Sequence, residues 1–135
     1  MTSTHSGSPL PVAAAVANLE IILKEKLAGR AAQMGEILNS EVKRIQQKYP
    51  KVLGCAQGKG LVAGIQVVKS GTKTPDPDLA LRINIACFQK GLLMFAPVGI
   101  AGECLKICPP LNIPEDALRE SIQVFEEAVD EVCGG

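Results

Sequence analysis

The sequence predicts an α+β fold: a small two-layer sandwich in which a short, mainly antiparallel sheet of three to four strands is covered on one face by helices and preceded by a linking helix. Two observations predict it. Apolar residues recur at steps of three and four in long segments, and shorter β-rich segments bounded by glycine or proline lie between them. The expected order along the 135 residues is helix, helix, strand, helix, strand, strand, helix.

The first helix is expected to begin at Pro9 or Pro11, because proline is favoured in the first helical turn. Ser6 or Ser8 then precedes it as a plausible N-cap. An alanine-rich run follows and should remain helical to about Lys26.

Gly29 is expected to break or kink this first helix, and a second helix follows over 30–49. Pro50 ends the second helix, because proline cannot continue it. The residues of its apolar face are spaced three and four apart: Met34, Leu38, Val42, Ile45 and Tyr49.

The middle of the chain is expected to hold one strand and one helix. The segment LVAGIQVVK, 61–69, is rich in β-branched residues and follows Gly58 and Gly60, which predicts a strand. A helix over 77–90 is then predicted, with Gly91 ending it. Its apolar face would carry Leu79, Ile83 and Cys87.

Two short strands and a final helix are expected in the last third of the chain. The segments LLMFAPV and CLKIC predict strands joined by the glycine-bearing turn GIAGE. The final helix follows over 112–132, where Asn112 and Glu115 have the spacing of a capping box. Its apolar residues also lie at helical steps: Leu118, Ile122, Phe125, Val129 and Val132.

The composition excludes several classes of protein. Fourteen basic residues balance fourteen acidic ones, so no positive field favours binding to nucleic acid. The longest mostly apolar stretch, 10–23, is too short to span a membrane, and no basic segment suggests a signal peptide. Five cysteines at irregular spacing predict free thiols in a reducing compartment, and therefore a cytoplasmic protein.

Two familiar types of site can be set aside. The glycines of GKGLVAG precede a strand, whereas a dinucleotide-binding turn lies between a strand and a helix. Cys104 and Cys108 would lie on the same side of a strand, but a metal site needs further cysteine or histidine ligands and the only histidine is distant at His5, so we expect no metal site. His5 also has no obvious nucleophile or orienting acid, so no catalytic triad is predicted.

Lys106 is the one charged residue of the apolar segment CLKIC. A lysine there either points to solvent from an edge strand or is held toward a site, and the spacing leaves both interpretations open. The pair Pro109–Pro110 ends the strand. Lys106 should therefore lie near the rim of the sheet, within reach of a substrate carboxylate.

The opening segment MTSTHSGSPLP places clustered hydroxyl groups ahead of the first helix. Such groups, with free backbone N–H groups at a helix N-terminus, form a natural phosphate site. Simple N-capping by the same serines is the alternative.

Four segments taken together, TSTHSGSPLPVAAAVANLEII, GKGLVAGIQ, KGLLMFAPVG and LKICPPLNIPEDALRE, resemble the C-terminal portion of the class III aminotransferases. These are the ornithine and 4-aminobutyrate type of fold type I enzymes that depend on pyridoxal 5'-phosphate. The resemblance implies that Ser3 and Thr4 contact the cofactor phosphate in the neighbouring subunit of a homodimer. It also places Lys106 where the family usually carries an arginine that binds the substrate carboxylate, and Gln57 where many members have arginine.

The resemblance divides the chain into a phosphate loop and linking helix, 1–28, and a C-terminal small domain, 29–135. It implies transfer of an amino group from an amino acid such as 4-aminobutyrate to a 2-oxo acid. No lysine of this chain matches the family's Schiff-base lysine, so we expect no bound cofactor and no activity from this chain alone. A fragment of a dialkylglycine-decarboxylase-like enzyme and a non-catalytic dimerisation or interaction module remain the alternatives.

Overall fold

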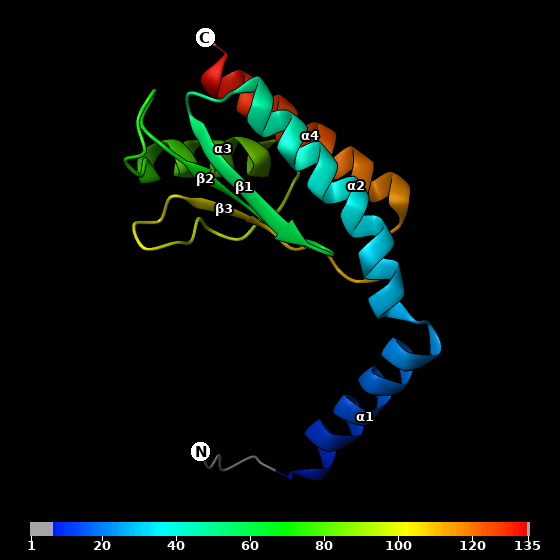
Figure 1. Cartoon of the computed structure of the whole chain (residues 1–135). Helices are drawn as coiled ribbons and strands as arrows, with labels where there is room; N and C mark the ends of the chain where they lie inside the picture. Colours follow the sequence, from blue (N-terminus) through cyan, green and yellow to red (C-terminus); the bar gives the residue numbers. More distant parts are fainter. Residues whose placement is uncertain (1–6, 135) are drawn as a thin grey trace.

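The computed structural model describes residues 7–134, and they form four helices and a three-stranded sheet (Figure 1). The strands lie in the order β1–β2–β3, and both neighbouring pairs are antiparallel. The predicted α+β fold is therefore confirmed. The elements are α1 (Pro9–Lys24), α2 (Leu27–Lys48), β1 (Leu53–Lys59), β2 (Val62–Val67), α3 (Pro77–Gln89), β3 (Cys104–Ile107) and α4 (Glu115–Cys133).

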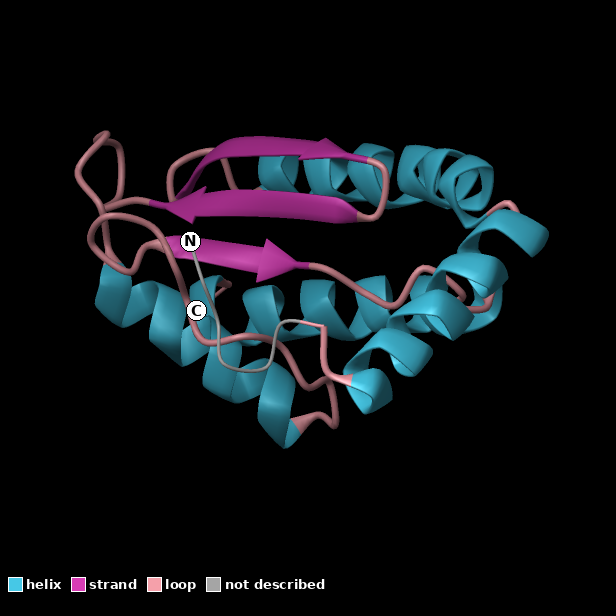
Figure 2. Ribbon diagram, turned by 90° about the horizontal axis from the view of Figure 1, so that it is seen from below, coloured by secondary structure: helices cyan, strands magenta, loops and turns pink. Residues whose placement is uncertain are grey.

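One face of the sheet is buried against helices α2, α3 and α4 (Figure 2). Side chains alternate along β2, so that Ile65 and Val67 are buried while Gln66 is exposed. The same alternation buries Leu105 of β3. The described core is aliphatic apart from Met34, Cys87 and Phe125 of α4, and Phe125 is the largest fully buried side chain.

Strand β1 was not predicted, because its sequence LGCAQGK contains no β-branched residue. It pairs with β2 through a two-residue turn, Gly60 and Leu61, which joins the partners Lys59 and Val62. Gly60 has φ +56°, a conformation that favours glycine and suits the first position of a tight hairpin turn. Gly58 and Gly60, which were expected to precede a strand, therefore belong to a hairpin: Gly58 lies in β1 and Gly60 in the turn.

The tip of this hairpin lies directly on α2. A side chain at Gly35 of α2 would overlap the backbone of Gly60. Asn39, one turn further along α2, donates to the Gly60 carbonyl oxygen at 3.0 Å and to the Gly35 carbonyl oxygen at 2.6 Å. The hairpin is thus fixed to the helix by a close backbone approach and by one amide side chain.

The boundary between the first two helices lies at Lys26, and the predicted break at Gly29 is wrong. Lys26 has φ +51°, the only positive φ at a described residue other than glycine, and Gly29 lies inside α2. Helix α1 buries none of its residues and extends away from the sheet (Figure 1). A left-handed residue at the joint turns the chain before α2 begins.

The segment 92–98 does not form the predicted strand. Only Val98 pairs with β3, in an isolated bridge in which Val98 and Cys104 exchange both backbone hydrogen bonds, at 2.8 and 2.7 Å. The loop between them is held by the buried Glu103, whose carboxylate accepts a hydrogen bond from the Ala101 N–H at 2.9 Å. Pro97 has no N–H to donate, which limits further pairing along this segment.

Helix α4 begins later than expected. Pro114 is its N-cap residue and makes no side-chain cap, so the predicted capping box of Asn112 and Glu115 is wrong. The acidic residues Glu115 and Asp116 instead lie in the first turn, where their negative charges interact favourably with the positive end of the helix dipole. None of the helices formed by residues 7–134 has the length and apolar character needed to cross a membrane.

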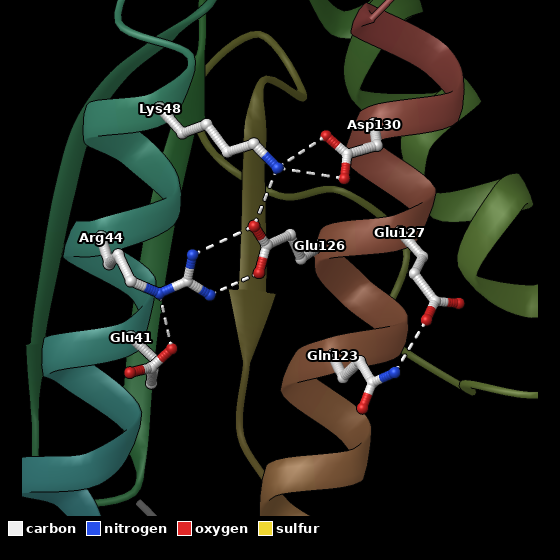
Figure 3. A network of polar contacts seen from close by, with 7 residues as sticks. All are labelled: Glu41, Arg44, Lys48, Gln123, Glu126, Glu127 and Asp130. Carbon is white, nitrogen blue, oxygen red and sulfur yellow. Dashed lines mark hydrogen bonds and ion pairs between the residues drawn. The ribbon is translucent and has the colours of Figure 1, made fainter.

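Helices α2 and α4 are joined on their outer side by a network of ion pairs (Figure 3). The carboxylate of Glu126 accepts from the guanidinium of Arg44 and from Lys48 Nζ, the latter at 3.0 Å. Lys48 also pairs with Asp130, and Arg44 with Glu41. The hydrogen bond from Arg44 lowers the pKa of Glu126 to about 2.

Removing this carboxylate is expected to destabilise the fold in a pH-dependent way. We expect Glu126→Gln to lower the free energy of unfolding by about 1 kcal/mol at pH 7, the upper end for exposed pairs, because two cations share this carboxylate. The Glu126 pKa is lower in the folded chain than in the unfolded one. Its contribution is therefore complete above the ordinary pKa of glutamate, near 4.5, and is lost as the pH falls toward 2.

Urea unfolding of both proteins between pH 7 and pH 2 measures this difference. Glu127→Gln is the matched control, because Glu127 lies on the same helix and bonds only Gln123 among the residues drawn in Figure 3. A constant difference between Glu126→Gln and the parent chain across this range would contradict the prediction.

Candidate functional site

Lys106 lies on β3 at the edge of the sheet, on the face opposite the helices. Its strand neighbour Leu105 is fully buried, whereas Lys106 is half-buried and pairs in register with Gly64 of β2. The Lys106 Nζ atom lies over the ring of Phe95, 5.1 Å from its centroid. This cation–π contact holds the ammonium group against the segment that precedes β3.

A cavity of about 570 Å³ adjoins Lys106. One wall is the segment 92–96, a second is the end of β3 with the two prolines that follow it, and a third is α4. The wall on α4 consists of Leu118, Ser121, Ile122 and Phe125. The cavity has the size of a small-molecule site and is predominantly apolar.

Lys106 is the only charged side chain in the lining of this cavity. Within residues 7–134 it forms no ion pair, whereas Arg44, Lys48, Lys90 and Arg119 each do. The Ser121 hydroxyl donates to the Ala117 carbonyl oxygen at 2.7 Å, so its hydrogen is already engaged within its own helix. The geometry leaves one cation free for an anionic group at the mouth of an apolar cavity.

Gln57 lies in the same row of the sheet as Lys106. It pairs with Gly64, and Gly64 pairs with Lys106, so all three positions share one face. Because Gly64 has no side chain, the space between the two longer residues is open except for Cys104 Sγ, which approaches Gly64 closely. The amide of Gln57 is exposed and donates to Cys55 Sγ at 3.2 Å.

Three of the cysteines, Cys87, Cys104 and Cys133, do not have the character of nucleophiles. Burial raises the pKa of the Cys87 thiol to about 11, and burial likewise raises the pKa values of Cys104 and Cys133. All five cysteines are free. In the part of the chain from 7 to 134, no cluster of three metal-ligating side chains occurs.

The remaining predicted site residues lie outside the described residues. Ser3 and Thr4, the predicted phosphate contacts, and His5 belong to the segment 1–6. Their roles stay predictions, as does the role of Lys106 toward a substrate.

Sequence reasoning did not identify Phe95 or the wall of the cavity on α4. Phe95 is eleven residues from Lys106 in a segment that was expected to pair as a strand, and its ring position depends on how that segment departs from the sheet. In the sequence, Ile122 is only one member of the helical pattern of apolar residues, and Ser121 is not part of that pattern. No local signal distinguishes a helix face that lines a cavity from one that is fully packed.

The chain matches known proteins along nearly its whole length. The family model described as "Aminotransferase class-III" matches residues 1–129. The chain is 31% identical to an alanine/serine racemase of Pyrococcus horikoshii over 98% of this chain and 27% of that protein. It is 33% identical to the 5-aminovalerate aminotransferase DavT of Pseudomonas putida over 96% of this chain and 30% of that protein.

Solved structures agree with these matches. A Bacillus anthracis aminotransferase is 36% identical, with a TM-score of 0.77 over 87% of this chain and 27% of that chain. A transaminase solved with L-alanine is 26% identical, with a TM-score of 0.86 over 99% of this chain and 31% of that chain. The chain thus spans between about a quarter and a third of the length of these proteins.

Proposed function

The chain belongs to the class III aminotransferases, and from this premise we propose that it forms the small C-terminal domain of an enzyme that transfers an amino group from an amino acid to a 2-oxo acid. Enzymes of this family depend in general on pyridoxal 5'-phosphate. The amino donor that we propose is an amino acid such as 4-aminobutyrate, and a 4-aminobutyrate aminotransferase of Mycobacterium leprae is among the relatives, 30% identical over 90% of this chain.

One observation carries the proposal at the level of the site: Lys106 is a half-buried cation at the mouth of a cavity, without an acidic partner among the described residues. A substrate carboxylate is the group that such a cation binds. Lysine provides the charge but not the planar, two-pronged hydrogen bonding of arginine, so it sets the orientation of the carboxylate less strictly.

The described residues do not by themselves form a site for pyridoxal phosphate. The cavity wall is apolar, and neither an acidic side chain nor a cluster of phosphate-binding groups lines it. We therefore assign residues 7–134 no part in the cofactor's covalent chemistry. Their proposed part is to hold and orient the substrate carboxylate through Lys106.

A competing function is a non-catalytic dimerisation or interaction module. The observation that favours it is helix α1, on which large apolar side chains such as Leu10, Leu19 and Leu23 are exposed to 58–81%. A helix that is apolar on all sides normally packs against another protein surface.

Incubation of the pure chain with pyridoxal phosphate, followed by borohydride reduction and peptide mass analysis, tests the proposal. We expect weak labelling that is spread over several exposed lysines, with no lysine labelled to one equivalent. Lys106→Arg is the matched control and should leave the pattern elsewhere unchanged. One equivalent of label on a single lysine, together with amino transfer from 4-aminobutyrate to 2-oxoglutarate by this chain alone, would overturn the proposal.

A further inference from the structure

The cavity beside Lys106 is larger than a carboxylate contact needs. Its volume is about 570 Å³, within the range of sites that enclose small molecules, and its walls are built from Leu92 and Met94, from Pro110 and from Ile122 and Phe125 of α4. Phe125 and Ile122 are also members of the hydrophobic core. The cavity is therefore a recess in the core that opens beside the ammonium group.

The chemistry of the recess is divided between its mouth and its interior. At the mouth, the Phe95 ring holds Lys106 Nζ at 5.1 Å, so that the cation has a defined place. On the α4 wall, the Ser121 hydroxyl already donates to the Ala117 carbonyl oxygen. An anionic head would be attracted to Lys106, whereas an anionic group elsewhere along the lining would lose its hydration without gaining a charged partner, because no other charged side chain lines the cavity.

We infer that this cavity receives the apolar side chain of the 2-oxo acid that accepts the amino group, or of the α-amino acid formed from it, whose carboxylate lies on Lys106. The inference rests on the proposed function and adds the class of substrate to it. With the carboxylate at the mouth, the adjacent 2-carbon stays at the rim, and the side chain on that carbon extends past Ser121 into the recess. Acids with a branched aliphatic side chain are favoured over acids with a charged one.

The test is equilibrium binding to this chain, followed by NMR shifts of the backbone amides of α4 and of the segment 92–96. Three probes share the same 2-oxo carboxylate and differ in the side chain: pyruvate, 4-methyl-2-oxopentanoate and 2-oxoglutarate. We expect 4-methyl-2-oxopentanoate to bind at least about tenfold more tightly than pyruvate, because each buried methylene adds to affinity in an apolar pocket. We expect 2-oxoglutarate to bind more weakly than 4-methyl-2-oxopentanoate.

Two variants separate the contribution of the Lys106 charge to binding from that of the apolar recess. Lys106→Met removes the charge but keeps an unbranched side chain, and should weaken all three probes by about tenfold. Ser121→Leu fills the recess, and should weaken 4-methyl-2-oxopentanoate alone. Lys59→Met is the control, because Lys59 is exposed at the end of β1. An unchanged urea midpoint shows that each variant is folded.

Equal affinity for pyruvate and 4-methyl-2-oxopentanoate, or no saturable binding of any probe, would overturn the inference. These results would leave the proposed aminotransferase function standing, since that is judged by the labelling experiment. If Lys106→Met binds 4-methyl-2-oxopentanoate with the same affinity as the parent chain, Lys106 does not bind the carboxylate, and that part of the proposed function is wrong as well.

Discussion

Replacing Gly35 with alanine is expected to lower the free energy of unfolding by about 2–3 kcal/mol, because the new Cβ would overlap the backbone of Gly60. Neither partner moves easily. Gly35 is in the middle of α2, and Gly60 forms the hairpin turn to which Asn39 is hydrogen-bonded. Contact with backbone atoms cannot be relieved by turning a side chain, so either the hairpin or the helix must shift.

The measurement is urea unfolding, with Gly29→Ala as the matched control. Gly29 lies in the same helix, and a Cβ added there meets nothing within 4 Å. That change should raise the free energy of unfolding by up to about 1 kcal/mol, because alanine favours the helix more than glycine does. If the two alanines shift stability in the same direction, the close approach of Gly35 and Gly60 does not exist in solution.

Truncating Phe125 to alanine is expected to cost about 3–5 kcal/mol of folding free energy. Its side chain is only 2% exposed and belongs to the core between α4 and the sheet. Removal of the ring would also merge the space that it leaves with the adjoining cavity, which increases the loss of folding free energy. A domain of this size has a stability of about 5–15 kcal/mol, so the variant should be folded only in part of the usual temperature range.

Phe88→Ala controls for the loss of an aromatic ring as such. Phe88 is 65% exposed on α3, and its truncation should change stability by no more than about 0.5 kcal/mol. Phe125→Leu, which keeps most of the volume, should lie between the two and remain folded. Thermal unfolding of all three measures the order, and a Phe125→Ala melting temperature equal to that of Phe88→Ala would contradict the prediction.

The fold could be predicted from the sequence where apolar residues keep helical spacing over a long, continuous segment. The helical steps in α2 and α4 extend over several turns, and both helices are present close to the predicted bounds. Strand β1 was missed because its stability comes from pairing with β2 and from the turn at Gly60, and its own residues have little preference for a strand. The strand predicted over 92–98 is wrong for the opposite reason. Its residues favour a strand, but residues pair only where a neighbouring backbone is in register, and here only Val98 pairs.

The site was predictable only in part. Lys106 was noticeable as a charge among apolar residues, and that signal is local. Its alignment with Gln57 depends on the register of three strands, and the network around Glu126 joins residues 78–82 positions apart. Contacts of this kind arise from tertiary packing, and no spacing within a single element encodes them.

The joint at Lys26 gives α1 the mechanics of a lever. The helix has 16 residues and is therefore roughly 24 Å long at about 1.5 Å per residue. A rotation of about 10° at the pivot would sweep its far end through roughly 4 Å, more than the length of a hydrogen bond. Whatever the N-terminal end of this arm contacts is thus positioned by the backbone conformation of the two-residue joint, Glu25 and Lys26.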